Sequence, residues 1–137
     1  MTDSAIHGAK ACVFDAYGTL FDVHSAVGRH RGALGDKADA VSATWRDKQL
    51  QYSWLRSLMG EYVPFWQVTR EALDYAFAMH GVENDMLAED LMGAYLELDA
   101  YPEVKSTLET LAGQGFKLAI LSNGSREMLD AAVRNAG

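Results

Sequence analysis

Residues 11–21 are Ala11-Cys12-Val13-Phe14-Asp15-Ala16-Tyr17-Gly18-Thr19-Leu20-Phe21. The apolar first part of this segment favours a short buried β-strand, which ends at Asp15 just before a Gly-Thr turn. In open parallel α/β sheets, ligands bind outside the carboxyl ends of the strands. Asp15 is therefore a candidate site residue. The alternative role for its carboxylate is to cap the turn that follows.

A second apolar run, residues 116–121, also ends in small polar residues. Ser122 and Asn123 follow it directly. If the two predicted strands are parallel neighbours, these two side chains lie at the same sheet edge as Asp15 and Thr19. The alternative role for Ser122 and Asn123 is a turn and cap before the next helix.

The long segment between the two predicted strands has a helical pattern. Apolar residues recur at helical spacing in three stretches, with Gly60 and Gly81 as predicted C-terminal stops and Asp85 as a predicted N-cap. A crossover between parallel strands needs only about a dozen residues, so several of these helices must form an inserted subdomain. We therefore predict an α/β fold with a Rossmann-like, doubly wound parallel sheet core at residues 1–21 and 101–137 and a helical cap subdomain at residues 22–100.

Two strands do not make a stable sheet, so the predicted core is incomplete in this chain. We expect the 137 residues to be the N-terminal part of a longer protein. The helix predicted to end at Gly60 has a broader apolar surface than one core contact requires, which indicates a homodimer.

Composition excludes several classes of partner. A net charge of −7 argues against binding to nucleic acid, which requires a basic face. Cys12 is the single cysteine, and the four histidines show no metal-ligand spacing, so we expect neither a disulfide, a metal nor a cofactor. No apolar leader and no membrane-spanning run is present, so we expect a cytoplasmic protein.

The segments Asp15–Asp22 (DAYGTLFD) and Leu121–Gly124 (LSNG) resemble the first two motifs of the haloacid dehalogenase superfamily. More narrowly, residues 14–23, 45–50 and 52–59 resemble the L-2-haloacid dehalogenases, and the likeness covers nearly the whole chain. The family's third motif, a lysine, and its fourth, an acidic loop, have no match here, and both are expected beyond residue 137. The resemblance implies hydrolysis of (S)-2-haloacids to (R)-2-hydroxyacids, with inversion, through an aspartyl ester.

The resemblance also implies roles for individual residues. Asp15 is the nucleophile, and Arg46 receives the halide. From its place in the turn, Thr19 is expected to steady the Asp15 carboxylate or the turn beneath it. Ser122 points at the substrate carboxylate and Asn123 at the leaving halogen. From the residues alone, the alternative for Arg46 is an aliphatic stem packed on the helix with its guanidinium in solvent.

Four aromatic or apolar residues, Tyr17, Leu50, Phe65 and Trp45, are expected to line the substrate pocket or the cap, and ordinary core packing is the alternative. Tyr17 helps to distinguish dehalogenation from phosphoester hydrolysis. Phosphatases of the superfamily carry an acid at this position because the departing alcohol oxygen needs a proton, whereas halide needs none. A Mg²⁺-dependent phosphatase is therefore the second hypothesis, and an inactive fragment or helical association module is the third.

Overall fold

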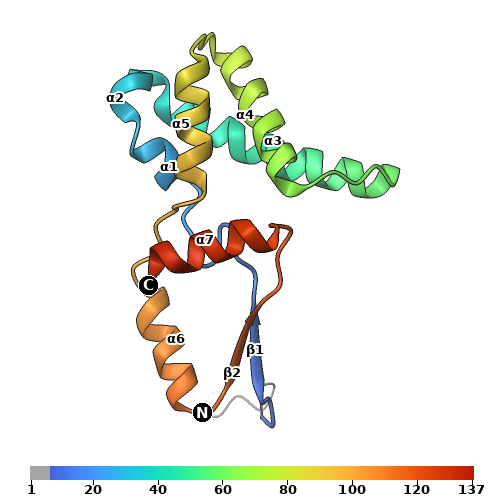
Figure 1. Ribbon diagram of the computed structural model, residues 1–137, viewed down its shortest axis with the longest axis vertical. Coiled ribbons are helices and arrows are strands. Elements are labelled where there is room, and N and C mark those ends of the chain that lie inside the picture. The colour runs from blue at the N-terminus through green and yellow to red at the C-terminus, as the bar shows by residue number, and fades with distance from the viewer. Residues whose placement is uncertain (1–6) are drawn as a thin grey trace.

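The computed structural model describes residues 7–137, in which most of the helices lie between the two strands along the chain and one helix follows the second strand (Figure 1). The described elements are β1 (Ala11–Phe14), α1 (Ser25–Gly28), α2 (Arg31–Leu34), the 3-10 turn η2 (Gly35–Lys37), α3 (Ala38–Met59), α4 (Phe65–His80), α5 (Asp85–Tyr95), α6 (Val104–Gly113), β2 (Lys117–Ile120) and α7 (Arg126–Ala136).

The two strands lie side by side and run parallel, which confirms the predicted sheet. Ala11 is opposite Lys117 and Phe14 is opposite Ile120. Asp15 comes directly after β1, and the Ser122–Asn123 pair comes just after β2. The polar residues that follow both strands therefore lie at the same edge of the sheet.

The structure contradicts the predicted burial of these strands. Val13 is 61% exposed and Leu118 is 38% exposed. The described chain contains only this pair of strands, so no third strand or helix layer covers the face on which Val13 lies. On the opposite face, where Leu118 lies with Phe14 and Ile120, an open hollow of about 870 Å³ separates the sheet from α7 at Leu129.

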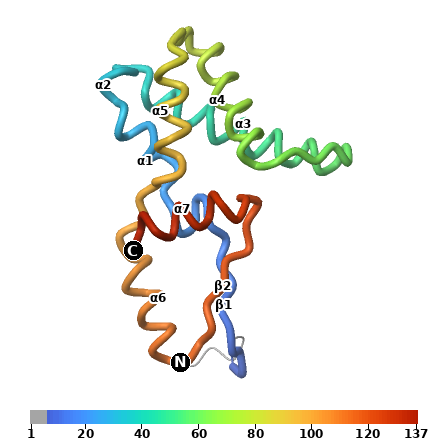
Figure 2. The backbone as a smooth tube through the Cα atoms, viewed as in Figure 1, coloured from blue at the N-terminus to red at the C-terminus, as the bar shows by residue number. Residues whose placement is uncertain are grey.

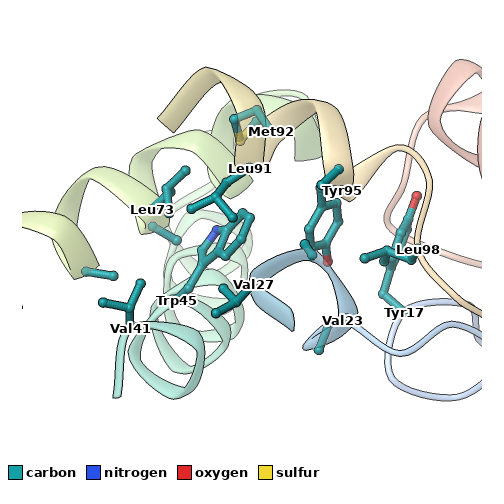
Figure 3. Packing of buried hydrophobic residues seen from close by; sticks show 14 of the residues in the cluster. Tyr17, Val23, Val27, Val41, Trp45, Leu73, Leu91, Met92, Tyr95 and Leu98 are labelled. Atoms are coloured by element: carbon teal, nitrogen blue, oxygen red, sulfur yellow. The ribbon is translucent and has the colours of Figure 1, made fainter. Parts of the chain in front are cut away.

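The helices between the strands form a well-packed core (Figure 3). Helices α3 and α4 pack along each other, and α5 packs against α1 and α4. The side chains of Val41, Leu73 and Leu91 are fully buried where these helices meet. The helical spacing of their apolar residues therefore corresponds to a real core face.

Helix ends follow the sequence prediction with one exception. Gly60 and Gly81 end α3 and α4 with φ values of 72° and 66°, a left-handed conformation in which glycine has no Cβ penalty. The predicted N-cap Asp85 is wrong, because Asn84 has the extended backbone of a cap and its side chain accepts a hydrogen bond from Leu87 N.

The backbone trace shows two groups of elements (Figure 2). One group contains β1, α6, β2 and α7, which we call the strand part, and the other contains α1 to α5, which we call the helical part. The two connecting segments pair with each other: Asp22 N donates to Asp99 O at 2.8 Å, and Tyr101 N donates to Leu20 O at 3.1 Å. These bonds hold the two groups together at the point where the chain passes between them.

Candidate active site

The nucleophile candidate lies on a tight turn. Thr19 Oγ1 donates to Asp15 Oδ2 at 3.1 Å. Backbone N–H groups of Leu20 and Phe21 both donate to Ala16 O, at 2.8 and 3.1 Å, which closes the turn under the carboxylate. Asp15 itself is exposed, so the described residues do not enclose its carboxylate in a pocket. The uncovered sheet edge is the physical reason.

Arg46 reaches from α3 to this same turn. Its Nη2 donates to Tyr17 O at 3.0 Å. A Cβ on Gly18 would lie 2.9 Å from that nitrogen, and Gly18 has a φ of +88°. Only glycine combines that backbone conformation with the close approach of a guanidinium. The helical part therefore places a positive charge against the residues that immediately follow Asp15.

Tyr17 packs inward from the turn. Its ring stacks on Tyr95 with centroids 5.3 Å apart, and it lies 5.7 Å from the ring of Phe65. The Tyr17 hydroxyl is buried and has no hydrogen-bond partner among residues 7–137. Burial raises the pKa of Tyr17 to about 12. The phenol therefore stays neutral near pH 7, where it is a poor proton donor.

The loop after β2 packs against the same ring. Ser122 Oγ accepts a hydrogen bond from Gly124 N at 3.1 Å, so this side chain stabilises the local turn. A Cβ on Gly124 would lie 2.7 Å from Tyr17 Cε2, a separation that real Cβ atoms do not tolerate. The close contact places the loop after β2 beside the loop after β1, with Asn123 exposed between them and solvent.

A cavity of about 290 Å³ extends the site along the helical part. Asn123 and Phe65 both line it, together with Val63 and Arg56. Leu50 is half-buried and is not among its lining residues. Trp45 lies in the core, where its Nε1 donates to Thr69 O at 2.9 Å. The structure thus brings Phe65 to the site and assigns Trp45 to packing.

Sequence reasoning missed a buried polar cluster behind Arg46. Gln49 is 1% exposed and Thr69 is 0% exposed, and both are hydrogen bonded. Tyr95 belongs to the same cluster, and burial raises its pKa, so its phenol is neutral. The available signal was Gln49 itself, which lies one helical turn after Trp45 and so shares its core-facing side.

Two further observations concern the described residues as a whole. Between residues 7 and 137, no three His, Cys, Asp or Glu side chains are grouped as they would need to be to hold a metal ion. None of the described helices combines the length and the apolar character that a membrane crossing needs.

A carboxylate at the carboxyl edge of a parallel sheet, beside a cation from an inserted helical region, is an arrangement suited to nucleophilic attack by an aspartate. Comparison with known families agrees. The family model described as haloacid dehalogenase-like hydrolase matches residues 9–137, so the chain belongs to this family.

Individual members of the family are similar to this chain in sequence and in structure. The chain is similar to the (S)-2-haloacid dehalogenase 4A of Burkholderia cepacia, with 52% identity over 130 residues, 94% of this chain and 56% of that protein. It is also similar to a solved dehalogenase structure, with a TM-score of 0.92 and 51% identity, covering 95% of this chain and 58% of the other.

A third relative was solved as a covalent complex. This is the L-2-haloacid dehalogenase from Xanthobacter autotrophicus with chloropropionic acid covalently bound, with a TM-score of 0.85 and 49% identity, covering 94% of this chain and 52% of the other. The chain spans little more than half the length of the curated relatives that it matches.

Proposed function

We propose that this chain carries the nucleophile and the halide-binding residues of an enzyme that hydrolyses (S)-2-haloacids to (R)-2-hydroxyacids. The observation that carries the proposal is the contact between Arg46 and the turn that follows Asp15. A halide that leaves from a carbon attacked by Asp15 is stabilised by a positive charge close by. Because the chain as a whole has a net charge of −7, that positive charge must come from an individual side chain near the site.

The reaction proceeds in two steps. An Asp15 oxygen attacks C2 of the haloacid from the side opposite the halogen, so the new C–O bond forms as the C–halogen bond breaks and halide leaves with the bonding pair. Water then attacks the carboxyl carbon of the ester, not C2, which frees the hydroxyacid and returns the aspartate. Because only the first step occurs at C2, the net result is inversion.

The hydrogen bonding around Asp15 distinguishes its two oxygens. Thr19 holds Oδ2 at 3.1 Å, so Oδ1 is the oxygen available for attack. Ser122 and Asn123 follow β2 at the same sheet edge, which supports the proposal that they bind the substrate carboxylate and the halogen. Phe65 offers an apolar wall in the neighbouring cavity, and Leu50, which lies outside that cavity, stays a prediction.

Tyr17 favours the dehalogenase over the phosphatase. Phosphoester cleavage needs a proton for the departing oxygen, and a phenol with a pKa of about 12 does not supply one near neutral pH. Its ring, packed against Phe65 and Tyr95, offers an apolar wall to the site.

The proposal is tested by the first chemical step. The chain is incubated with (S)-2-chloropropionate in the presence of EDTA, and chloride release and the mass of the protein are followed together. We expect one equivalent of chloride and a covalent adduct that maps to Asp15. Asp15→Asn should abolish both, and Asp36→Asn, an exposed aspartate in η2, is the matched control. Adduct formation in Asp15→Asn would refute the proposal, as would hydrolysis of phosphomonoesters with no dehalogenation.

We further propose that α1 to α5 act as the cap of the site and that two copies associate through the end of α3. This end projects beyond the other helices (Figure 1). It exposes Trp54 (66%), Leu58 (85%) and Met59 (68%), and Tyr62 continues the surface at 85%. Large exposed apolar patches mark association sites, and a two-fold dimer pairs the same patch on each copy.

The dimer is tested by light scattering on size-exclusion fractions. Leu58→Glu is expected to give a monomer with unchanged helicity, and Val133→Glu, which is also exposed but lies on α7, should leave the dimer intact. A wild-type chain that stays monomeric at high concentration would contradict the proposed association. The cytoplasmic location stays a prediction.

A further inference from the structure

We infer that Gln49, held by Thr69 and Tyr95, is a positioning residue that aims the guanidinium of Arg46 at the turn after Asp15. The inference deepens the proposed function and rests on it for the role of Arg46. Its basis is the buried polar cluster of Gln49, Thr69 and Tyr95, which the steps of the proposed reaction do not use.

The hydrogen bonds determine how the Gln49 amide is oriented. Thr69 Oγ1 has a single proton and donates it to Phe65 O at 2.7 Å, so this oxygen accepts from Gln49 Nε2 at 2.9 Å. Tyr95 OH lies 2.9 Å from the same nitrogen and 3.3 Å from Gln49 Oε1, so the bond to Thr69 is the one that sets the orientation. It turns the amide nitrogen away from Arg46 and the amide oxygen toward it.

Arg46 completes the arrangement from the other side. It can only donate hydrogen bonds, and its Nη1 donates to Gln49 Oε1 at 2.9 Å while its Nη2 donates to Tyr17 O at 3.0 Å. Two acceptors on different elements therefore hold the guanidinium. Two of its five N–H groups are used in this way, and the others remain for an anion.

The choice of an amide has a chemical consequence. Gln49 accepts from Arg46 without bringing a negative charge, so the cation is oriented and its charge is not neutralised. A glutamate would orient the guanidinium equally well, but it would form an ion pair and weaken the attraction for halide. A neutral acceptor in a buried place suits a cation that must attract an anion.

Two variants separate orientation from charge. Gln49→Met removes the acceptor at similar size, and Gln49→Glu keeps the acceptor and adds a charge. Tyr95→Phe removes only the hydroxyl that helps to hold the amide. Gln51→Met is the matched control, because Gln51 is exposed on the same helix.

The first readout does not depend on activity. Modification of Arg46 by phenylglyoxal is followed by peptide mapping, with Arg126, whose side chain is 91% exposed, as internal reference. We expect Gln49→Met to react about tenfold faster at Arg46, the effect of losing one hydrogen bond to a charged group. Tyr95→Phe should show a smaller rise, and Gln49→Glu and Gln51→Met should react like the wild type.

The second readout is the single-turnover rate of ester formation on Asp15. We expect Gln49→Met to lower the maximal rate about tenfold with little change in the half-saturating substrate concentration, because halide charge develops only in the transition state. Gln49→Glu should lower it further although Arg46 stays protected. A loss of packing alone would reduce the number of active molecules and not the rate of each.

The outcomes are distinguishable. Wild-type reactivity at Arg46 in Gln49→Met, or an equal rise in Gln51→Met, would overturn the positioning role. A wild-type chain that forms no ester counts against the proposed function, and the Arg46 reactivity still decides whether Gln49 positions the guanidinium.

Discussion

The helical part and the strand part of this chain differ sharply in how well they are packed. In the helical part, Val41, Leu73 and Leu91 are fully buried (Figure 3). In the strand part, α6 buries none of its residues and the first three residues of β2 are exposed. Helices α3 to α5 have facing apolar stripes, whereas a pair of strands cannot cover both of its own faces.

The two parts contribute different components of the site. The nucleophile candidate Asp15 and the polar pair Ser122 and Asn123 belong to the open strand part, whereas Arg46 and its buried support belong to the helical part. The guanidinium of Arg46 is thus held by two hydrogen bonds, whereas the Asp15 carboxylate accepts one, from Thr19. The bond from Arg46 to Tyr17 O joins the two.

The largest expected effect tests the difference in packing directly. Leu91→Ala in the helical part should lower the free energy of unfolding by about 2–5 kcal/mol, because it leaves a cavity in a closed core. Leu118→Ala in β2 should cost less than about 1 kcal/mol, because this side chain is already 38% exposed. Urea unfolding followed by circular dichroism measures both. Equal losses would show that the strand part is as well packed as the helices.

A second prediction concerns the contact between the parts. Gly124→Ala should displace the Tyr17 ring, since the new Cβ would lie 2.7 Å from Cε2. We expect the rate of ester formation on Asp15 to fall by about tenfold or more, the effect of a 1–3 kcal/mol overpacking cost at the site. Gly113→Ala is the control, because nothing lies within 4 Å of its Cβ position. A wild-type rate in Gly124→Ala would show that the Tyr17 position is unimportant.

A third prediction uses the helix caps. Asn84 caps α5 in the helical part and Ser125 caps α7 in the strand part, each by accepting one backbone hydrogen bond. Replacement of either by alanine should cost about 1 kcal/mol. Hydrogen exchange should show a local effect of Ser125→Ala, confined to α7 and β2, and a broader effect of Asn84→Ala across the helical core. Identical exchange patterns would indicate one cooperative unit.

The smallest effect is a pH dependence in the helical part. Hydrogen bonds from Gln67, and then from Arg56, lower the pKa of Glu71 below its usual value. A lowered folded-state pKa stabilises the protein above the unfolded pKa of about 4.3, and this stability is lost as the pH falls through the folded value. About a third of each side chain is exposed, so screening limits the effect to about 0.5 kcal/mol.

Glu71→Gln should therefore lose less stability than the wild type between about pH 5 and pH 3. Thermal unfolding at a series of pH values measures this difference. Glu97→Gln, at an exposed position, is the control. A steeper acid loss in Glu71→Gln would contradict the direction of the pKa shift.

Much of the fold could be predicted because it depends on local patterns. The recurrence of apolar residues along α3, α4 and α5 predicts which face is buried, and Gly60 and Gly81 predict where two helices end. The strand that ends at Asp15 was predicted correctly in position and wrongly in burial. The burial of a strand depends on how many strands and helices lie beside it, and the sequence of the strand itself does not show that number.

The candidate site also contains residues that the sequence alone indicated and residues whose role only the structure revealed. Asp15, Thr19, Ser122 and Asn123 were found because polar residues directly after apolar strands are visible in the sequence. Arg46 was chosen by resemblance, and its hydrogen bond to Tyr17 O is a tertiary fact. Gln49, Thr69 and Tyr95 escaped notice because their significance lies in pairings across three helices.

By itself, then, the sequence determined the types of the elements, most of their ends and the strand edge at which the carboxylate emerges. The periodic spacing of apolar residues in helices and strands is a property of a few consecutive residues, so it can be recognised without a tertiary structure. Only the folded chain decided which cation meets that edge, which amide holds the cation and which faces stay open. These three features depend on contacts between residues far apart in the sequence. The distances between such residues are set by the packing of the helices and strands and not by their spacing along the chain.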